Sequence, residues 1–249
     1  MTMLPQPTVE KMLAMRLEAM VESWKRIEED EQSQALPFAD KLALMVDHLW
    51  TWRQNLAFEQ RLKRAHLQSG PCVENIDYRS SRHLDKSLMR ALTLDSSWVR
   101  QHENVFITGP TGIGKSWLST ALAQKACRDG YSVLYYRASA LFRDLAIARG
   151  DGTLPQLFFR LARLDVLVVD DWAMAPLEEN QRRDFWEICE DRYQARSLIL
   201  TSQLPVDQWH AQIGDPTIAD GILDRIVHGA HRLQLDGDSL RKKPPAPKR

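Results

Sequence analysis

Several features are scarce in this sequence of 249 residues, and each scarcity argues against a class of protein. The three cysteines lie far apart without a C-x-x-C pair, so neither a disulfide framework nor a zinc cluster is indicated and a reducing compartment fits best. With 11 glycines and 12 prolines the chain is neither collagen-like nor of low complexity. Its apolar runs are too short to span a bilayer, and its start lacks the pattern of a secretory signal. We therefore expect a cytoplasmic protein with no membrane partner.

Charge is balanced over the whole chain but not along it. The 33 basic and 33 acidic residues give a formal net charge of zero, so any attraction to nucleic acid must come from local asymmetry. Between residues 53 and 90, eight basic side chains face four acidic ones. Hydrophobic residues make up 44% and charged residues 27%, which is typical of a globular protein with room for one medium domain and a smaller appendage.

The first part of the sequence has the apolar spacing of helices. Apolar side chains recur at three- and four-residue steps over residues 8–31, which predicts one amphipathic helix. A second, longer helical pattern starts after Pro37 and ends near Gly70. We expect residues 1–75 to form a small helical domain that binds a partner and, through its basic end, DNA.

From residue 104 the pattern changes to short apolar runs that alternate with helical patterns. This alternation predicts βαβ units around a parallel sheet, which is an α/β fold. The predicted strands cover residues 104–108, 132–136, 165–169, 197–201 and 231–235. The predicted helices cover residues 115–129, 139–148, 178–194 and 216–228. We expect this domain to span residues 76–243, with a flexible basic tail over residues 244–249.

A phosphate-binding motif lies between the first predicted strand and the first predicted helix of this domain. Residues 109–116 read Gly-Pro-Thr-Gly-Ile-Gly-Lys-Ser, an intact G-x-x-x-x-G-K-S. Glycines let the backbone N–H groups surround phosphate oxygens, Lys115 reaches the β- and γ-phosphates, and the Ser116 hydroxyl can bind Mg²⁺. The motif predicts nucleotide contacts from Gly109, Pro110, Thr111, Gly112, Ile113, Gly114, Lys115, Ser116 and Trp117.

Two carboxylates follow the apolar run over residues 164–169. Asp170 is the natural carboxylate ligand for Mg²⁺, and Asp171 is placed to orient or deprotonate the attacking water. Either acid alone could be a helix cap or a surface residue, but the pair follows a phosphate loop at a suitable distance. The spacing suits nucleotide hydrolases that insert a strand between phosphate loop and acid, and it argues against a small-molecule kinase.

The sequence resembles the AAA+ ATPases and, more narrowly, the IstB-like transposition helper proteins of bacterial insertion sequences, which are relatives of the replicative helicase loaders. The resemblance covers nearly the whole chain. Besides the phosphate loop, it is carried by residues 13–20 (LAMRLEAM), 102–105 (HENV), 190–193 (EDRY), 201–206 (TSQLPV), 214–220 (GDPTIAD), 222–228 (ILDRIVH) and 239–242 (SLRK).

The resemblance implies a P-loop NTPase fold of the AAA+ type, ATP and Mg²⁺ as cofactors, and a homo-oligomer that shares its ATP sites. Ser202 or Gln203 would be the first sensor of the γ-phosphate, and Arg241 the second. Arg225 would be an arginine finger that enters a neighbour's site. The catalytic set is then Lys115, Asp170, Asp171 and Arg225. Many AAA+ proteins have Glu where this chain has Asp171, and slow turnover would suit a timed switch.

The resemblance further implies an ATPase that binds double-stranded DNA and assists a cognate transposase in selecting or remodelling target DNA. ATP binding would drive assembly, and hydrolysis would reset it. No motif for reading base sequence is present, so phosphate contacts are expected. The basic side chains that we expect at the DNA are Arg53, Arg61, Lys63, Arg64, Arg79, Arg82, Arg143 and Arg149.

Three other functions are compatible with parts of this sequence. A helicase loader would share the ATPase core and give its N-terminal region to a hexameric helicase. A small-molecule phosphotransferase would need a substrate pocket that the sequence does not reveal. A nucleotide-binding protein without activity is disfavoured by the intact set of Lys115, Ser116 and Asp170.

Overall fold

A computed structural model describes residues 5–78 and 82–240 of the chain. The chain divides into two compact units, one ending at Gln60 and the other beginning at Arg61. The division falls inside helix α4 (Phe38–Ala65), ahead of the domain boundary expected near residue 75. Within the described ranges, no helix is both long and apolar enough to cross a membrane.

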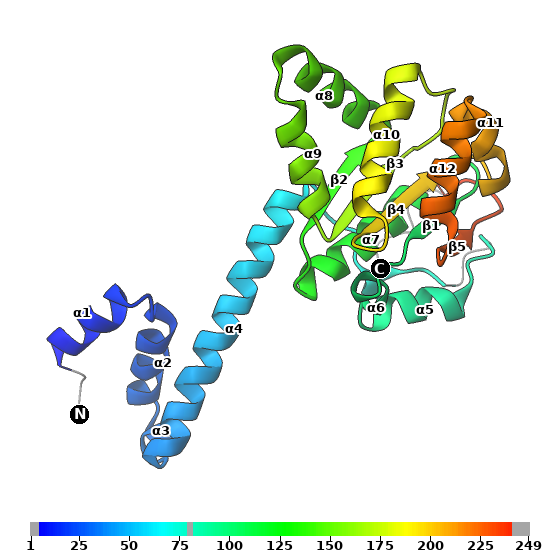
Figure 1. Ribbon diagram of the computed structural model, residues 1–249. Helices are drawn as coiled ribbons and strands as arrows, with labels where there is room; N and C mark the ends of the chain where they lie inside the picture. Colours follow the sequence, from blue (N-terminus) through cyan, green and yellow to red (C-terminus); the bar gives the residue numbers. More distant parts are fainter. Residues whose placement is uncertain (1–4, 79–81, 241–249) are drawn as a thin grey trace. The chain divides into compact units, whose positions relative to one another are not determined.

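The N-terminal unit is helical, as the apolar spacing predicts, but its first helix is interrupted. It contains α1 (Gln6–Ala14), α2 (Glu18–Glu29), α3 (Glu31–Gln34) and the first part of α4 (Figure 1). The single helix predicted over residues 8–31 is therefore wrong. Arg16 adopts a left-handed conformation with φ of 58°, and Asp30 is extended and caps α3 by accepting a hydrogen bond from the Ser33 N–H at 2.9 Å. Apolar spacing continues across both breaks, so periodicity alone does not reveal them.

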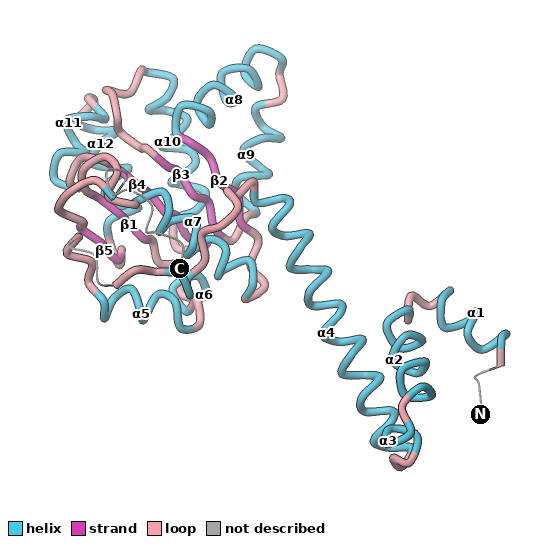
Figure 2. Tube along the Cα trace, turned by 180° about the vertical axis from the view of Figure 1, so that it is seen from behind, coloured by secondary structure: helices cyan, strands magenta, loops and turns pink. Residues whose placement is uncertain are grey.

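The second unit is built on a five-stranded sheet in which every neighbouring pair is parallel. Its strands are β1 (Val105–Thr108), β2 (Val133–Arg137), β3 (Val166–Asp170), β4 (Ser197–Ser202) and β5 (His231–Gln234). Their order across the sheet is β2-β3-β4-β1-β5, which can be followed in Figure 2. The predicted α/β fold and all five strands are confirmed. Strand β4 separates the acidic strand from the strand that leads into the phosphate loop, as the motif spacing indicates.

Helices cover both faces of this sheet. The helices of the second unit, after the end of α4, are α5 (Lys86–Leu94), α6 (Ser97–Arg100), α7 (Lys115–Arg128), α8 (Ala138–Asp151), α9 (Leu154–Arg163), α10 (Glu179–Arg192), α11 (Trp209–Ile213) and α12 (Pro216–Val227), with short 3₁₀ turns η1 (Val73–Asn75) and η2 (Val206–Gln208). Alternate strand residues such as Phe106, Leu167 and Leu200 form one apolar core with side chains of α8 to α12. The intervening strand residues are equally buried, and α7 contacts β1 to β4. The helices predicted at the places of α7, α8, α10 and α12 are confirmed, whereas α9 is absent from the prediction.

A buried arginine and a partly exposed aspartate tie the amino ends of the strands together. Arg192, 1% exposed at the end of α10, donates to the carbonyls of Leu161, Leu164, Asp165 and Ser197 at 2.6 to 3.3 Å. The Asp165 carboxylate accepts hydrogen bonds from the Ser132 N–H at 2.8 Å and its hydroxyl at 2.7 Å, which joins the starts of β2 and β3. The charged groups at this end of the sheet are therefore hydrogen-bonded within the fold.

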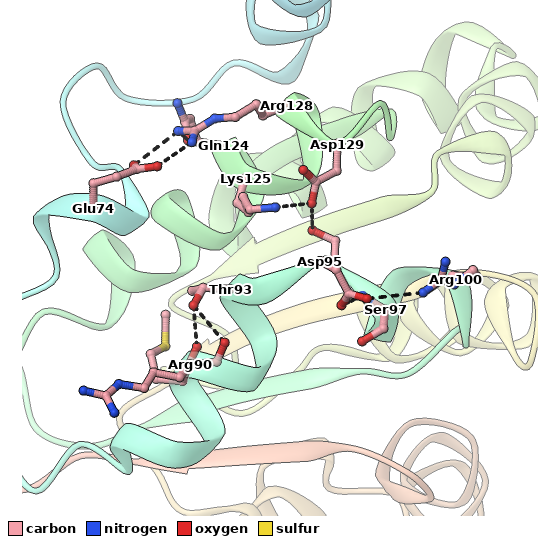
Figure 3. Close-up of polar contacts among 12 residues, drawn as sticks. Glu74, Arg90, Thr93, Asp95, Ser97, Arg100, Gln124, Lys125, Arg128 and Asp129 are labelled. Carbon is pink, nitrogen blue, oxygen red and sulfur yellow. Dashed lines mark hydrogen bonds and ion pairs between the residues drawn. The ribbon is translucent and has the colours of Figure 1, made fainter.

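Exposed ion pairs surround the C-terminal end of α7 (Figure 3). Arg128 forms an ion pair with Glu74 of η1, and Lys125 forms one with Asp129. Asp129 also accepts a hydrogen bond from the Ser96 hydroxyl at 2.7 Å, which links α7 to the start of α6. These contacts fasten the segment that precedes the sheet to the helix that follows the phosphate loop.

Candidate nucleotide-binding site

A cavity of about 550 Å³ opens at the carboxyl edge of the sheet, where ligands of parallel α/β sheets bind. The phosphate loop contributes Thr111, Gly112, Gly114, Lys115, Ser116 and Trp117 to its walls. The acidic pair Asp170 and Asp171 and the side chain of Gln203 also line it. The fold thus brings motifs that are far apart in the sequence to one cavity of nucleotide size.

The phosphate loop has the backbone that its glycines permit. Gly112 and Gly114 are left-handed, with φ of 82° and 98°, and α7 begins at the next residue, Lys115. The Lys115 ammonium donates to the carbonyls of Gly109 at 2.8 Å and Pro110 at 3.0 Å. Gly109 and Pro110 thus hold the Lys115 ammonium through their backbone carbonyls.

The segment after β5 packs against the phosphate loop and supports it. The Leu240 N–H donates to the Gly112 carbonyl at 3.0 Å, and a side chain at Gly112 would overlap the Ser239 hydroxyl. Ile113 is 1% exposed and anchors the loop inward without lining the cavity. The loop is therefore held by both its own glycines and a distant part of the chain.

Two hydroxyl groups hold the carboxylate of Asp170, which is 2% exposed at the end of β3. The Tyr135 hydroxyl donates to Oδ2 at 2.5 Å, and the Thr201 hydroxyl donates to Oδ1. Burial, together with the hydrogen bond to Asp170, raises the pKa of Tyr135, so the phenol stays protonated as a donor. Thr201 Oγ1 also accepts from the Asp171 N–H at 2.9 Å and so connects the two acids. The sequence motifs identify the acids but give no signal for Thr201 or Tyr135.

Asp171 follows in a strained backbone conformation. Its φ is 58°, in the left-handed region that residues other than glycine seldom occupy, and the residue lines the cavity. Because the N–H of Asp171 is fixed by Thr201, the turn out of β3 sets the direction of this carboxylate. Strained residues of this kind are concentrated at functional sites.

The structure separates the two candidates for the first sensor. Ser202 is fully buried, and its hydroxyl accepts a hydrogen bond from the Leu204 N–H at 3.2 Å. Gln203 lines the cavity, and Ser202 does not. Gln203 is therefore the better-placed candidate for the first sensor.

Of the two arginines predicted for the shared site, Arg225 lies within the described residues. The guanidinium of Arg225, on α12, donates to Glu190 at 2.6 Å and contacts Asp224 at 3.3 Å, and it lies over the rings of Trp186 and Tyr193. The hydrogen bond to Glu190 raises the pKa of Arg225. Arg225 does not line its own chain's cavity. Arg241 lies outside the described residues, although its neighbour Leu240 lines the cavity.

The basic side chains expected at DNA occupy different environments. Arg82 is 3% exposed and lines the nucleotide cavity, so the structure places it away from the surface on which we expected it. Arg61 is half-buried and donates to the Cys127 carbonyl at 2.7 Å, while Arg79 lies outside the described residues. The exposed members of the set are Arg53, Lys63, Arg64, Arg143 and Arg149, the last paired with Asp184.

The donor set for a metal consists of oxygen atoms. Ser116 and Asp170 both line the cavity, and a hydroxyl with a carboxylate suits Mg²⁺, which commonly takes few protein ligands beside phosphates and water. Over the ranges that the structure describes, no group of three His, Cys, Asp or Glu side chains could hold a metal by itself. These residues fit a metal that arrives with a nucleotide.

The parallel sheet, the phosphate loop after β1 and the acids after β3 define an α/β protein of the P-loop, AAA+ type. Solved structures agree. The replication initiator DnaA bound to AMPPCP and single-stranded DNA superposes with a TM-score of 0.56 at 20% identity, covering 70% of this chain and 52% of that one. The DnaC helicase loader does so with a TM-score of 0.53 at 18% identity, covering 66% of this chain and 96% of that one.

The family follows from sequence comparison. The model of the family described as IstB-like ATP binding protein matches residues 10–246, and the chain belongs to this family. An insertion sequence ATP-binding protein of Sinorhizobium fredii, y4pL, is 46% identical over 240 residues, which cover 96% of this chain and 98% of the relative. The resemblance inferred from the motifs is confirmed.

Proposed function

We propose that this protein is a Mg²⁺-dependent ATPase that assembles on double-stranded DNA and assists the transposase of an insertion sequence in choosing or remodelling its target. The observation that carries the ATPase part is the meeting of Lys115, Asp170 and Asp171 at one cavity. Kinship with insertion sequence ATP-binding proteins supports the role in transposition. A protein that acts on DNA in this way would be located in the cytoplasm.

Hydrolysis would use the residues of the cavity in distinct roles. Loop N–H groups and Lys115 would hold the phosphates, and Mg²⁺, bound through Ser116 and Asp170, would neutralise charge on the β- and γ-phosphates. Asp171 would orient a water and accept its proton as the water oxygen bonds to the γ-phosphorus and the bond to ADP breaks. Thr201 and Tyr135 would keep Asp170 in place, and Gln203 would contact the water or the γ-phosphate.

If a second copy of the chain completes the ATP site, assembly of the oligomer would depend on ATP binding. Arg225 lies outside its own cavity and is 27% exposed at its side chain, so a neighbouring subunit could receive it. To enter that site the guanidinium would exchange Glu190 and Asp224 for a phosphate. Arg241 would act in its own subunit as the second sensor.

DNA and the transposase would contact other parts of the chain. The exposed Lys63 and Arg64 at the end of α4 and Arg143 on α8 would contribute phosphate contacts, which add up when several subunits bind in a row. The N-terminal helical unit would engage the transposase and neighbouring subunits. Loading of a replicative helicase is the alternative, favoured by the fold shared with the DnaC helicase loader. A pull-down with the cognate transposase and with a hexameric helicase separates the two.

Light scattering tests the proposal. We expect the mass of the purified chain to rise far above that of one chain only with both ATP and long double-stranded DNA, and to fall again as salt is raised. Lys115→Ala should abolish this rise, whereas Lys86→Ala, at an exposed lysine of α5, should preserve it. A mass of one chain under all conditions would contradict the shared site.

A further inference from the structure

Arg82 is a buried cation in the nucleotide cavity that comes from outside the phosphate loop. Its side chain is 3% exposed, and it lines the cavity together with Gly114 and Lys115. The Arg82 carbonyl accepts a hydrogen bond from the Asp236 N–H at 3.1 Å, which fixes its backbone to the segment after β5. Its position is therefore set by the fold and not by a loose surface loop.

The guanidinium lies directly against the phosphate loop at a glycine. A Cβ atom added to Gly114 would lie 3.0 Å from Nη1 of Arg82, which is closer than ordinary carbon–nitrogen contact. Any other residue at Gly114 would thus push the guanidinium away from the loop. The glycine that starts α7 serves two purposes, since it allows a left-handed backbone and leaves room for the arginine.

The buried charge has few partners within the fold. Nη2 donates to the Asp77 carbonyl at 3.0 Å, while Nε is buried without a hydrogen-bond partner. Over residues 5–78 and 82–240, no carboxylate forms an ion pair with Arg82, and burial lowers its pKa while the charge of Asp77 raises it. A buried guanidinium is costly unless an anion compensates it. Arg192, the other buried arginine described above, also has an Nε without a partner, but its other nitrogen atoms donate to four carbonyls.

We propose that Arg82 is a phosphate ligand of the bound nucleotide, a second cation beside Lys115 that the segment between α4 and α5 supplies to the phosphate loop. A planar guanidinium with several donors is well suited to a phosphate group. This inference rests on the proposed function, because it requires that the cavity bind ATP. It replaces the DNA contact that the sequence suggests for this residue.

The test compares Arg82→Met, which keeps the apolar stem and removes the charge, with Arg100→Met at an exposed arginine of α6. Calorimetric titration of the full chain gives the ATP affinity, and competition with inorganic tripolyphosphate isolates the phosphate part. We expect Arg82→Met to weaken ATP and tripolyphosphate by the same factor, about tenfold to hundredfold, as loss of a charge-assisted hydrogen bond predicts. Arg100→Met should leave both affinities unchanged.

A second variant separates phosphate binding from support of the fold. Arg82→Lys keeps the charge and should recover most of the affinity, and thermal unfolding without nucleotide reports any loss of structure. A residue that only supported the fold would lower the unfolding temperature of both variants and leave the affinity of the folded protein unchanged.

The outcomes also distinguish this inference from the proposed function. Weaker ATP binding with an unchanged tripolyphosphate dissociation constant in Arg82→Met would mean a contact to the base or sugar and would overturn the proposal. Unchanged ATP binding by Arg82→Met would overturn it as well, with the ATPase intact. Failure of the wild-type chain to bind ATP would instead defeat the proposed function and this inference together.

Discussion

The two ends of the parallel sheet both bury charged side chains, but they use them differently. At the amino end, Arg192 donates to four backbone carbonyls and Asp165 accepts from Ser132, so both charges are hydrogen-bonded within the scaffold. At the carboxyl end, Asp170, Asp171 and Lys115 line a cavity. Both ends pay a desolvation cost, but only the second leaves charged groups facing a space that a ligand can enter.

The role of a buried charged group can therefore be inferred from its surroundings. A buried ion whose hydrogen bonds lie within the scaffold, away from any cavity, stabilises the fold, while one at the wall of a cavity is available for binding or chemistry. Substitutions at the amino end should therefore change stability, and those at the carboxyl end should change activity. Four predictions test this division, from the largest expected effect to the smallest.

The largest effect is expected for Asp171→Asn at the carboxyl end. The amide cannot accept the proton of the attacking water, so kcat for ATP hydrolysis should fall by about 10²- to 10⁴-fold. ATP binding and ATP-dependent assembly should persist, as calorimetry and light scattering can show. Asp165→Asn at the amino end is the matched control and should lower the melting temperature with little change in kcat. Normal hydrolysis by Asp171→Asn would remove that residue from catalysis.

The second effect concerns stability at the amino end. Arg192→Met removes the side-chain donor to four carbonyls, of which those of Leu161 and Asp165 keep a backbone donor, and should lower the free energy of unfolding by about 3–5 kcal/mol. Denaturant titration measures this loss. Arg183→Met, at an exposed position of the same helix, should change it by less than about 0.5 kcal/mol. A variant at Arg192 that unfolds like wild type, or that loses ATP affinity while fully folded, would break the proposed division.

The third effect is expected for the hydroxyl that joins the acids. Thr201→Val keeps the shape but removes the donor to Asp170 and the acceptor for the Asp171 N–H, so kcat should fall about tenfold and the Mg²⁺ requirement should rise. Tyr135→Phe removes one hydrogen bond to Asp170 and should act in the same direction more weakly. A magnesium titration of the ATPase rate measures both. An unchanged Mg²⁺ dependence in Thr201→Val would argue that Thr201 serves the fold alone.

The smallest effect is expected for the exposed ion pair between Arg128 and Glu74, which is neither buried nor part of a cavity wall. The hydrogen bond from Arg128 lowers the pKa of Glu74 to about 2 (Figure 3). Because the pKa is lower in the folded state, the pair stabilises the fold above the ordinary carboxyl pKa, and this contribution is lost as pH falls toward 2. Glu74→Gln should cost less than about 1 kcal/mol at pH 7, and the difference from wild type should shrink below about pH 4.5. A difference that grows in acid would contradict this assignment.

The sequence predicts the parts of this molecule that depend on local pattern. The strands, α7 and the phosphate loop follow from apolar alternation and glycine spacing, and Asp170 follows from its place after a buried strand. Thr201 and Arg82 do not, because their roles depend on contacts across the fold. Thr201 and Asp170 are 31 positions apart in the sequence and come together because their strands are neighbours in the sheet. Arg82 lies against Gly114 because of packing between distant segments. The break at Arg16 is missed for a related reason, since apolar spacing does not record backbone conformation.

The strand order also fixes when the nucleotide site can form during synthesis. The phosphate loop is complete in the chain by Ser116, but β1 has β4 and β5 as its neighbours, and these begin only at Ser197 and His231. The Leu240 N–H that supports Gly112 is made later still. Contacts between distant segments form slowly, and an emerging chain with β1 alone has unpaired strand edges that invite aggregation. ATP therefore cannot assist the early folding of this protein, and a nascent chain arrested before β5 would lack the finished candidate site.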